Sequence, residues 1–320
     1  MKYLLDGDPG HDDMVAFLLA AKHLDVVGIT SVHGNTPLVN STRNALRVVE
    51  MGGLTNIPVA RGRARPLVNA PVYAPEIHGV SGLDGMDLPE PTTRLHELDA
   101  VDFIIEMSHQ HANDLWLVPT GPLTNVAAAF IKDTTLGERI SGISLMGGSL
   151  TYGNSTPAAE FNIWADPEAA DVVFRSGVPI KMFGLNVTRM ANATKAELAH
   201  IREIGNPVAV TVGTLLEFYR SSLENVFGLT GASLHDPLAV AVFIKPELFT
   251  MKPMHVAIEL HGTLTRGMTV CDYRYVGTDE KRQAEGLDAI EHGETPNAEV
   301  AVDMDVPGFF DLLYETLALY

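Results

Sequence analysis

The chain has 320 residues, with 22 Lys and Arg against 40 Asp and Glu, so its formal net charge is −18. Hydrophobic residues make up 46% of the chain, which excludes an intrinsically disordered protein. Because the excess of acid repels phosphate groups, we expect no nucleic-acid partner and no anionic-membrane partner.

The sequence also favours a cytoplasmic protein. Only residues 1–5 precede the first acidic residue, which leaves no room for the apolar region of a signal peptide. The apolar runs 14–21 and 238–244 are much shorter than the ~18 residues needed to span a bilayer. The single cysteine, Cys271, cannot form an internal disulfide, as is typical of proteins in a reducing cytosol.

Short runs of apolar and β-branched residues alternate with helical patterns in the first half of the chain. We expect strands over 3–5, 26–32, 115–118, 143–146, 180–185 and 255–260. We expect helices over 13–24, 37–51, 99–111, 123–131 and 167–176. This alternation predicts an α/β fold with an open, mostly parallel, Rossmann-like sheet and helices on both faces. Such sheets bind ligands where loops leave the carboxyl ends of the strands.

The second half of the chain is richer in helices, which we expect over 195–203, 207–227, 237–244 and 308–319. No Ser/Gly-rich linker, internal repeat or low-complexity run divides the chain, so we expect one domain over 1–320. Segment 69–93 is rich in Gly and Pro and lacks periodicity. Long irregular loops in compact domains are often functional, and we expect a flexible loop near the site here.

Four acidic residues follow the first expected strand. Asp6, Asp8, Asp12 and Asp13 lie within eight residues, and such a group of like charges is costly unless a cation neutralises it. Ca²⁺ and Mg²⁺ prefer oxygen ligands, and the group lies where a parallel sheet places its site. The alternative is that Asp12 or Asp13 caps the following helix. Capping would leave Asp6 and Asp8 unexplained.

Further polar blocks occur later in the chain, three of them just after expected strands. They are His33-Gly34-Asn35, Pro119-Thr120-Gly121-Pro122-Leu123-Thr124-Asn125, Met146-Gly147-Gly148 with Gly153-Asn154 and Glu160-Phe161-Asn162 beyond it, and His235-Asp236-Pro237. Because the carboxyl ends of parallel strands share one rim, we expect these blocks to surround one site. They supply groups that bind hydroxyls but no cluster of Arg or Lys for a phosphate.

These blocks resemble the nucleoside hydrolase family, which comprises inosine-uridine-preferring and pyrimidine-type ribonucleoside hydrolases. The resemblance covers nearly the whole chain, and the later blocks follow in the family's order. It implies hydrolysis of the N-glycosidic bond of ribonucleosides such as uridine, cytidine or inosine, through an oxocarbenium-like transition state and with Ca²⁺ as cofactor. The family's signature, Asp-x-Asp-x-Gly-x-Asp-Asp, is present as Asp6, Asp8, Gly10, Asp12 and Asp13.

The same resemblance implies a role for each matching residue. Asp6 would orient its neighbours rather than bind the metal. Family members are often dimers or tetramers, which implies a homo-oligomer. Ca²⁺ would be held by Asp8, Asp13, Asp236 and the backbone carbonyl of Thr120. The ribose hydroxyls would be held by Asp12, Asn35, Asn154, Glu160 and Asn162.

The reaction needs a base for the attacking water and an acid for the leaving nucleobase. We predict Asp8 as the general base and His235 as the acid, because a histidine titrates near neutrality. The alternatives are that His235 merely precedes a helix and that Asp236 caps it. His78, in segment 69–93, is a second candidate for activating the leaving group, with a solvated loop histidine as the alternative. His11 is at a variable position of the signature and is given no role.

Apolar and aromatic side chains are expected to contact the nucleobase. The candidates are Phe161, Phe218, Tyr219 and Phe227, with core packing as the alternative for Phe218 and Phe227. Neither Trp116 nor Trp164 is expected to stack on the base. The pair of His78 and His235 favours the inosine-uridine or pyrimidine branch of the family.

Two other functions stay open on the sequence. A phosphatase similar to haloacid dehalogenases would use Asp6 as a nucleophile together with Mg²⁺. Gly10 lies where that family usually has Thr or Val, and no Lys or Thr/Ser phosphate clamp is evident. A non-catalytic protein that binds a nucleoside or Ca²⁺ is the other alternative, although candidates for base, acid and metal ligands are all present.

Overall fold

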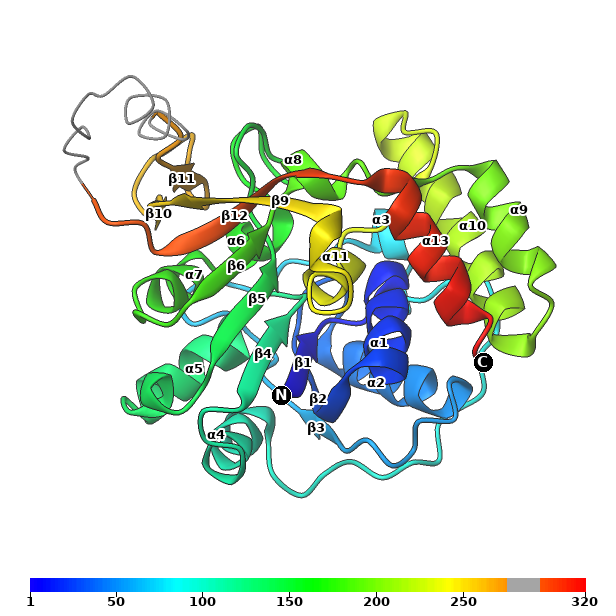
Figure 1. Cartoon of the computed structure of the whole chain (residues 1–320), viewed down its shortest axis with the longest axis horizontal. Helices are drawn as coiled ribbons and strands as arrows, with labels where there is room; N and C mark the ends of the chain where they lie inside the picture. The colour runs from blue at the N-terminus through cyan, green and yellow to red at the C-terminus, as the bar shows by residue number, and fades with distance from the viewer. Residues whose placement is uncertain (275–293) are drawn as a thin grey trace.

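The computed structural model describes residues 1–274 and 294–320. Within these ranges the central sheet has eight strands in the order β3-β2-β1-β4-β5-β6-β12-β9 (Figure 1). Neighbouring strands pair in parallel, except that β9 runs antiparallel to β12. The strands are β1 (Lys2–Gly7), β2 (Asp25–Ser31), β3 (Val59–Arg61), β4 (Leu115–Pro119), β5 (Gly142–Met146), β6 (Ile180–Phe183), β9 (Phe249–Met254) and β12 (Ala298–Met304).

Helices cover both faces of this sheet, which confirms the predicted fold class. Leu4 of β1 belongs to one apolar core cluster, while Tyr3 and Leu5 belong to the other, as the alternation of side chains along a strand requires. One face is covered by α4 (Ala100–Gln110), α5 (Thr124–Lys132) and α7 (Pro167–Phe174). The other is covered by α1 (His11–His23), α2 (Leu38–Met51), α11 (Pro237–Ala241) and α13 (Val306–Leu317).

The expected helices of the second half are also present. α9 (Lys195–Glu203) and α10 (Pro207–Phe227) pack together beside α1 and α13 (Figure 1). Asn206 caps α10 by accepting a hydrogen bond from the Ala209 N–H, and Gly228, with φ of 70°, ends it in the left-handed conformation. Short helices are α3 (Pro75–His78), α6 (Phe161–Ala165) and α8 (Leu185–Thr188), with 3₁₀ turns at η1 (Leu136–Glu138) and η2 (Pro246–Leu248).

Several strands differ from the sequence prediction. The strand expected over 255–260 is instead β10 (Val256–Ile258), which pairs antiparallel with β11 (Thr269–Cys271) outside the central sheet. The sheet edges are β3, which has only three residues, and β9, which contains Pro253 and partly exposed side chains. Such edge strands lack the buried apolar pattern that identifies central strands. A further pair is β7 (Asn192–Ala193) with β8 (Ala232–Ser233).

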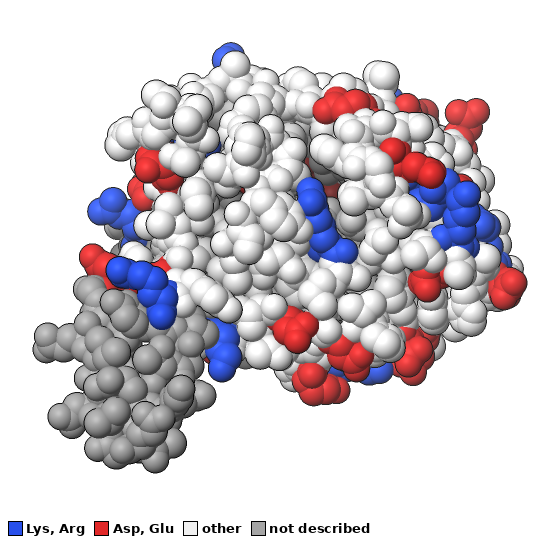
Figure 2. Space-filling view, turned by 90° about the horizontal axis from the view of Figure 1, so that it is seen from above, with Lys and Arg blue, Asp and Glu red and all other residues white. Residues whose placement is uncertain are grey.

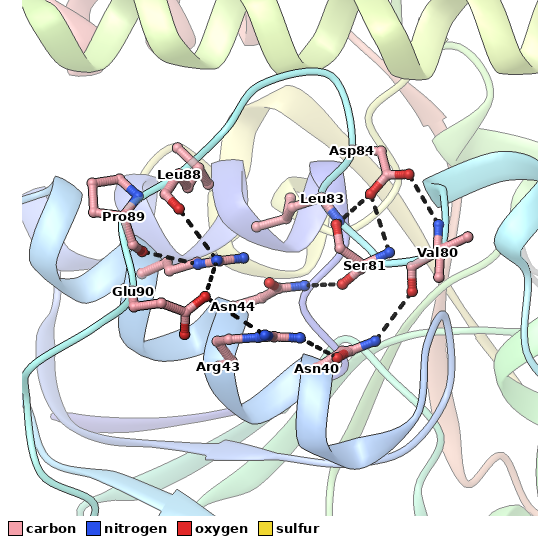
Figure 3. A network of polar contacts seen from close by, with 11 residues as sticks. Asn40, Arg43, Asn44, Val80, Ser81, Leu83, Asp84, Leu88, Pro89 and Glu90 are labelled. Carbon is pink, nitrogen blue, oxygen red and sulfur yellow. Dashed lines mark hydrogen bonds and ion pairs between the residues drawn. The ribbon is translucent and has the colours of Figure 1, made fainter.

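Part of segment 69–93 is tied to α2 by side chains that bind its backbone (Figure 3). Asn40 donates a hydrogen bond to the Val80 carbonyl, and Asn44 donates to the Ser81 carbonyl. Arg47 binds the carbonyls of 88 and 89 and the carboxylate of Glu90. The mobility of the rest of this segment and the single-domain organisation stay predictions.

Figure 2 views the molecule from above relative to Figure 1, and the middle of this face is largely uncharged apart from a basic side chain near its centre. Acidic side chains lie mainly toward the margin of the view. Among the described residues, no helix has the length and apolar character needed to cross a membrane.

Candidate active site

A cavity of about 530 Å³ lies at the carboxyl ends of the central strands. The loops after β1, β2, β4 and β5 supply much of its lining, as expected for a parallel sheet. Asp8 and Asp13 lie beneath this lining: the Asn35 N–H donates to Asp8 Oδ2 over 2.6 Å, and Thr120 Oγ1 donates to Asp13 Oδ1 over 2.7 Å. The other residues predicted for the site all line the cavity: Asp12, Asn35, His78, Thr120, Asn154, Glu160, Phe161, Asn162, Tyr219, His235 and Asp236.

The tight turn between β1 and α1 brings the signature residues together. A Cβ atom at Gly10 would lie 2.6 Å from His78 Nδ1 and 2.8 Å from Asn35 Nδ2, so only glycine fits there. The Gly10 N–H donates to Asp13 Oδ2 over 3.0 Å at the start of α1. Asp13 thus supports the helix terminus, as the capping alternative expects, and it also faces the other carboxylates. Binding of a cation by this acid stays a prediction.

Three buried carboxylates converge at one wall of the cavity, two of them in its lining. One oxygen from each of Asp12, Asp13 and Asp236 lies within 4.8 Å of the others. The side chain of Asp236 makes no capping hydrogen bond to α11, although it stands at the N-cap position. Asp8 lies outside this closest group but is near enough for its charge to raise the pKa of Asp236.

Burial is the main reason why these carboxyl groups resist ionisation. It raises the pKa of Asp12 to about 7, with the charge of Asp13 adding to the effect. It also raises the pKa of Asp8 and of Asp236 well above the ordinary value. Four buried acids this close together need a compensating positive charge to ionise together. Carboxylate and carbonyl oxygens are the donors that a hard divalent cation prefers, so this donor set fits Ca²⁺.

Asp6 is completely buried and supports its neighbours. Its Oδ1 accepts hydrogen bonds from Thr30 Oγ1 (2.6 Å) and Asn125 Nδ2 (2.7 Å), and its backbone carbonyl accepts one from the Thr120 N–H (2.8 Å). Within the described part of the chain, Asp6 Oδ2 has no hydrogen-bond partner, and burial raises the pKa of Asp6 to about 7. Asp6 does not line the cavity, and its Oδ1 is held by Thr30 and Asn125, so it is not placed to attack a substrate phosphate as the phosphatase hypothesis requires.

A second polar wall is built at the start of α6. Glu160 caps this helix by accepting hydrogen bonds from the N–H groups of Asn162 (2.9 Å) and Ile163 (3.2 Å), and it also accepts one from the Gly148 N–H. Asn162 Nδ2 donates to the Thr120 carbonyl over 2.7 Å. Asn154 Oδ1 accepts from the Phe161 N–H over 2.8 Å. These contacts fix the side chains that the resemblance assigns to the ribose.

His235 joins the site from the loop before α11. Its backbone N–H donates to Asp12 Oδ2 over 3.3 Å, and its Nδ1 lies 2.7 Å from Thr188 Oγ1. Burial, with a smaller contribution from the charge of Arg189, lowers the pKa of His235 to about 3. The ring is therefore neutral near pH 7. If the Thr188 hydroxyl donates to Nδ1, the proton of His235 is on Nε2.

Some of the lining was predicted and some was not. Phe227, a candidate for contacting the nucleobase, lines the cavity, and so does Trp164, which was not expected to stack on the base. Arg189 also lines it, and its guanidinium lies 4.8 Å from the centre of the Tyr152 ring. Arg189 is an isolated basic residue after a short helix, and no motif marks it. His11, which was given no role, packs its ring against His78. Both side chains are buried rather than solvated. Phe218 also contacts the His11 ring.

Comparisons with known proteins agree with this geometry. The family model for inosine-uridine preferring nucleoside hydrolases matches residues 3–311. The chain belongs to this family. Its members named ribonucleoside hydrolases act on N-glycosyl bonds, so the protein is a nucleoside hydrolase. This finding removes the support for the phosphatase and for the non-catalytic binding protein.

The hydrolase is similar to curated and solved proteins over its whole length. It is 43% identical to the pyrimidine-specific ribonucleoside hydrolase RihA of Escherichia coli strain K12, over 99% of this chain and 98% of RihA. Its fold matches a purine-preferring ribonucleoside hydrolase from Gardnerella vaginalis with a TM-score of 0.88, 32% identity and coverage of 99% and 98%. It also matches the plant nucleoside hydrolase PpNRh1 with a TM-score of 0.89, 28% identity and coverage of 100% and 99%.

Proposed function

We propose that this nucleoside hydrolase is Ca²⁺-dependent and cleaves pyrimidine ribonucleosides, uridine and cytidine, with inosine as a poorer substrate. The observation that carries the proposal is the group of buried carboxylates, Asp8, Asp12, Asp13 and Asp236, at one wall of a cavity of about 530 Å³. The similarity to a pyrimidine-specific hydrolase supports the preference for uridine and cytidine. We also propose a cytoplasmic location and a homo-oligomer, a dimer or tetramer.

The metal would be held by Asp8, Asp13, Asp236 and the Thr120 carbonyl. When bound, Ca²⁺ would polarise a water molecule and offset the charges of the buried acids. The Thr120 carbonyl is fixed by the hydrogen bond from Asn162 Nδ2, which occupies only one of its two lone pairs. The Asn35 N–H orients the carboxylate of Asp8, so that Asp8 can accept a proton from the water as general base.

The ribose would lie between the carboxylates and the start of α6. Asp12, Asn35, Asn154, Glu160 and Asn162 all line the cavity there and would hold the sugar hydroxyls. As the N-glycosidic bond breaks, positive charge develops on the ribose ring. Oxygen atoms of fixed carboxylates and amides beside that ring stabilise this charge electrostatically.

The nucleobase would occupy the more apolar end of the cavity, beside Phe161, Tyr219 and the two histidines His78 and His235. The bond to the base breaks with its electron pair moving to the base, and this negative charge needs a hydrogen-bond or proton donor. A neutral His235 with its proton on Nε2 would serve as that donor. Because the His235 N–H donates to Asp12, His235 would lie near the ribose as well.

A panel of nucleosides tests this proposal. We expect ribose release from uridine and cytidine, less from inosine, and at least about 100-fold less from 2′-deoxyuridine, because a missing hydroxyl leaves buried polar groups of the site unpaired. The measurement is kcat/KM for each nucleoside, from reducing sugar or from free base for the deoxyriboside. Equal values for uridine and 2′-deoxyuridine would contradict the ribose contacts, and activity on inosine alone would contradict the base preference.

A further inference from the structure

The ring of His11 is buried within a group of aromatic side chains and has a fixed orientation. It lies nearly parallel to Tyr219, at 3° with 5.3 Å between ring centres, and to Phe218, at 17° and 5.6 Å. The ring centre of His78 is 5.4 Å away on the cavity side. Packing on these sides prevents the imidazole from turning, so each ring nitrogen of His11 faces one partner.

The first partner of His11 is a backbone carbonyl. His11 Nε2 lies 2.8 Å from the Asp84 carbonyl oxygen. A carbonyl oxygen only accepts, so Nε2 carries the proton and donates it. The acceptor is itself held in place, because the Asp84 carboxylate accepts hydrogen bonds from the N–H groups of Val80 (3.0 Å) and Ser81 (3.1 Å) (Figure 3). An imidazole ring with its one proton on Nε2 presents a lone pair on Nδ1.

The second partner is His78. The Nδ1 atoms of His11 and His78 lie 3.2 Å apart. Since His11 presents a lone pair, a proton on His78 Nδ1 makes this contact a hydrogen bond, whereas the other tautomer would oppose two lone pairs. The backbone N–H of His11 also points at His78 Nδ1, over 3.4 Å, and this hydrogen bond would need the other tautomer, with a lone pair on His78 Nδ1. It is longer than the contact between the two Nδ1 atoms, and that tautomer would leave their lone pairs opposed at 3.2 Å.

We propose that His11 is a positioning residue that holds His78 with its proton on Nδ1, so that the Nε2 lone pair of His78 accepts a hydrogen bond from an N–H group of the nucleobase. His78 lines the cavity, and among the described residues its Nε2 has no hydrogen-bond partner. The uracil of uridine has one N–H group, at N3. This role deepens the proposed function and rests on it: His78 then recognises the base, while His235 serves the leaving group.

Two substrates and three variants test the inference. 3-Methyluridine lacks the N3–H group, and nitrophenyl riboside has no base N–H at all. For the wild type, we expect kcat/KM to be at least about 10-fold higher for uridine than for 3-methyluridine, the worth of one good hydrogen bond. His11→Phe keeps a flat ring but loses both nitrogens, so this ratio should fall toward that of His78→Phe, while turnover of nitrophenyl riboside changes little. His11→Asn retains an acceptor near the place of Nδ1 and should restore part of the ratio.

A direct observation of the tautomer completes the test. In ¹⁵N spectra of the whole protein, with His78 assigned by His78→Phe, we expect a protonated Nδ1 and an unprotonated Nε2, and a shift of the proton toward Nε2 in His11→Phe. A His78 protonated on Nε2 in the wild type would overturn the inference, as would an unchanged substrate ratio in folded His11→Phe. If the wild type releases no ribose from uridine, the proposed function fails, and the ¹⁵N spectra alone then decide the role of His11.

Discussion

Asp13→Asn is expected to remove Ca²⁺ binding and to lower kcat/KM for uridine by more than about 100-fold. Loss of a residue that only supports a metal ligand costs up to about 100-fold, and loss of a ligand itself should cost more. Asp13 belongs to the group of buried carboxylates, and it accepts hydrogen bonds from the Gly10 N–H and Thr120 Oγ1. An amide has the same shape but lacks the charge that a divalent cation needs. Both kcat/KM and the bound calcium per chain are measured.

A thermal unfolding series separates metal binding from folding. Ca²⁺ binds the folded wild type and should raise its unfolding temperature, whereas Asp13→Asn should show no such rise. The matched control is Asp166→Asn, because Asp166 is also a buried aspartate but caps α7 outside the cavity lining. That control should lose stability yet keep the response to Ca²⁺. Full activity or a normal Ca²⁺ response in Asp13→Asn would refute the assignment of this ligand.

His235→Ala is expected to lower kcat/KM for uridine by about 100-fold or more, the usual cost of losing one hydrogen-bond donor to developing negative charge. The same change should cost much less with nitrophenyl riboside, because nitrophenolate leaves without a donor. Burial lowers the pKa of His235 to about 3, so the neutral ring is the donor across the whole range near pH 7. The loss should therefore not depend on pH between about 6 and 8. Only groups with pKa values inside that range change the dependence of kcat/KM on pH there.

Thr188→Val is the matched control for this donor. Thr188 Oγ1 contacts His235 Nδ1 at 2.7 Å, and valine has nearly the same shape without the hydroxyl. We expect a smaller loss than for His235→Ala, again with uridine and not with nitrophenyl riboside. Equal losses on both substrates for His235→Ala would remove the donor role and leave a structural one.

The sequence was sufficient for β1, β2, β4, β5 and β6 and for bringing most of the candidate site residues to one cavity. The buried runs of β1, β4 and β5 are largely apolar, and their loops carry the polar blocks, so topology brings residues as distant as Asp13 and Thr120 together.

Three strands of the central sheet were missed. The edge strand β3 has only three residues, and the edge strand β9 contains Pro253 and partly exposed side chains. β12 lies inside the sheet, but Glu299 and Asp303 interrupt its apolar run.

The role proposed for His11 and the presence of Arg189 in the cavity lining could not be predicted from the sequence. His11 gains its partners only when α1, segment 69–93 and α10 meet, and no spacing rule connects positions 11, 84 and 219. For Asp236, by contrast, a local pattern suggested the wrong contact, because Asp-Pro is a good signal for helix capping. In the structure its carboxylate makes no capping hydrogen bond and faces the other acids.

The central claim is that buried carboxylates hold a Ca²⁺ ion on which ribonucleoside hydrolysis depends. The most direct measurement is ribose release from uridine by the wild type, before and after treatment with a chelator and after Ca²⁺ is returned. We predict turnover that is lost on chelation and restored by Ca²⁺. Undiminished turnover in protein shown to be free of metal would contradict the claim.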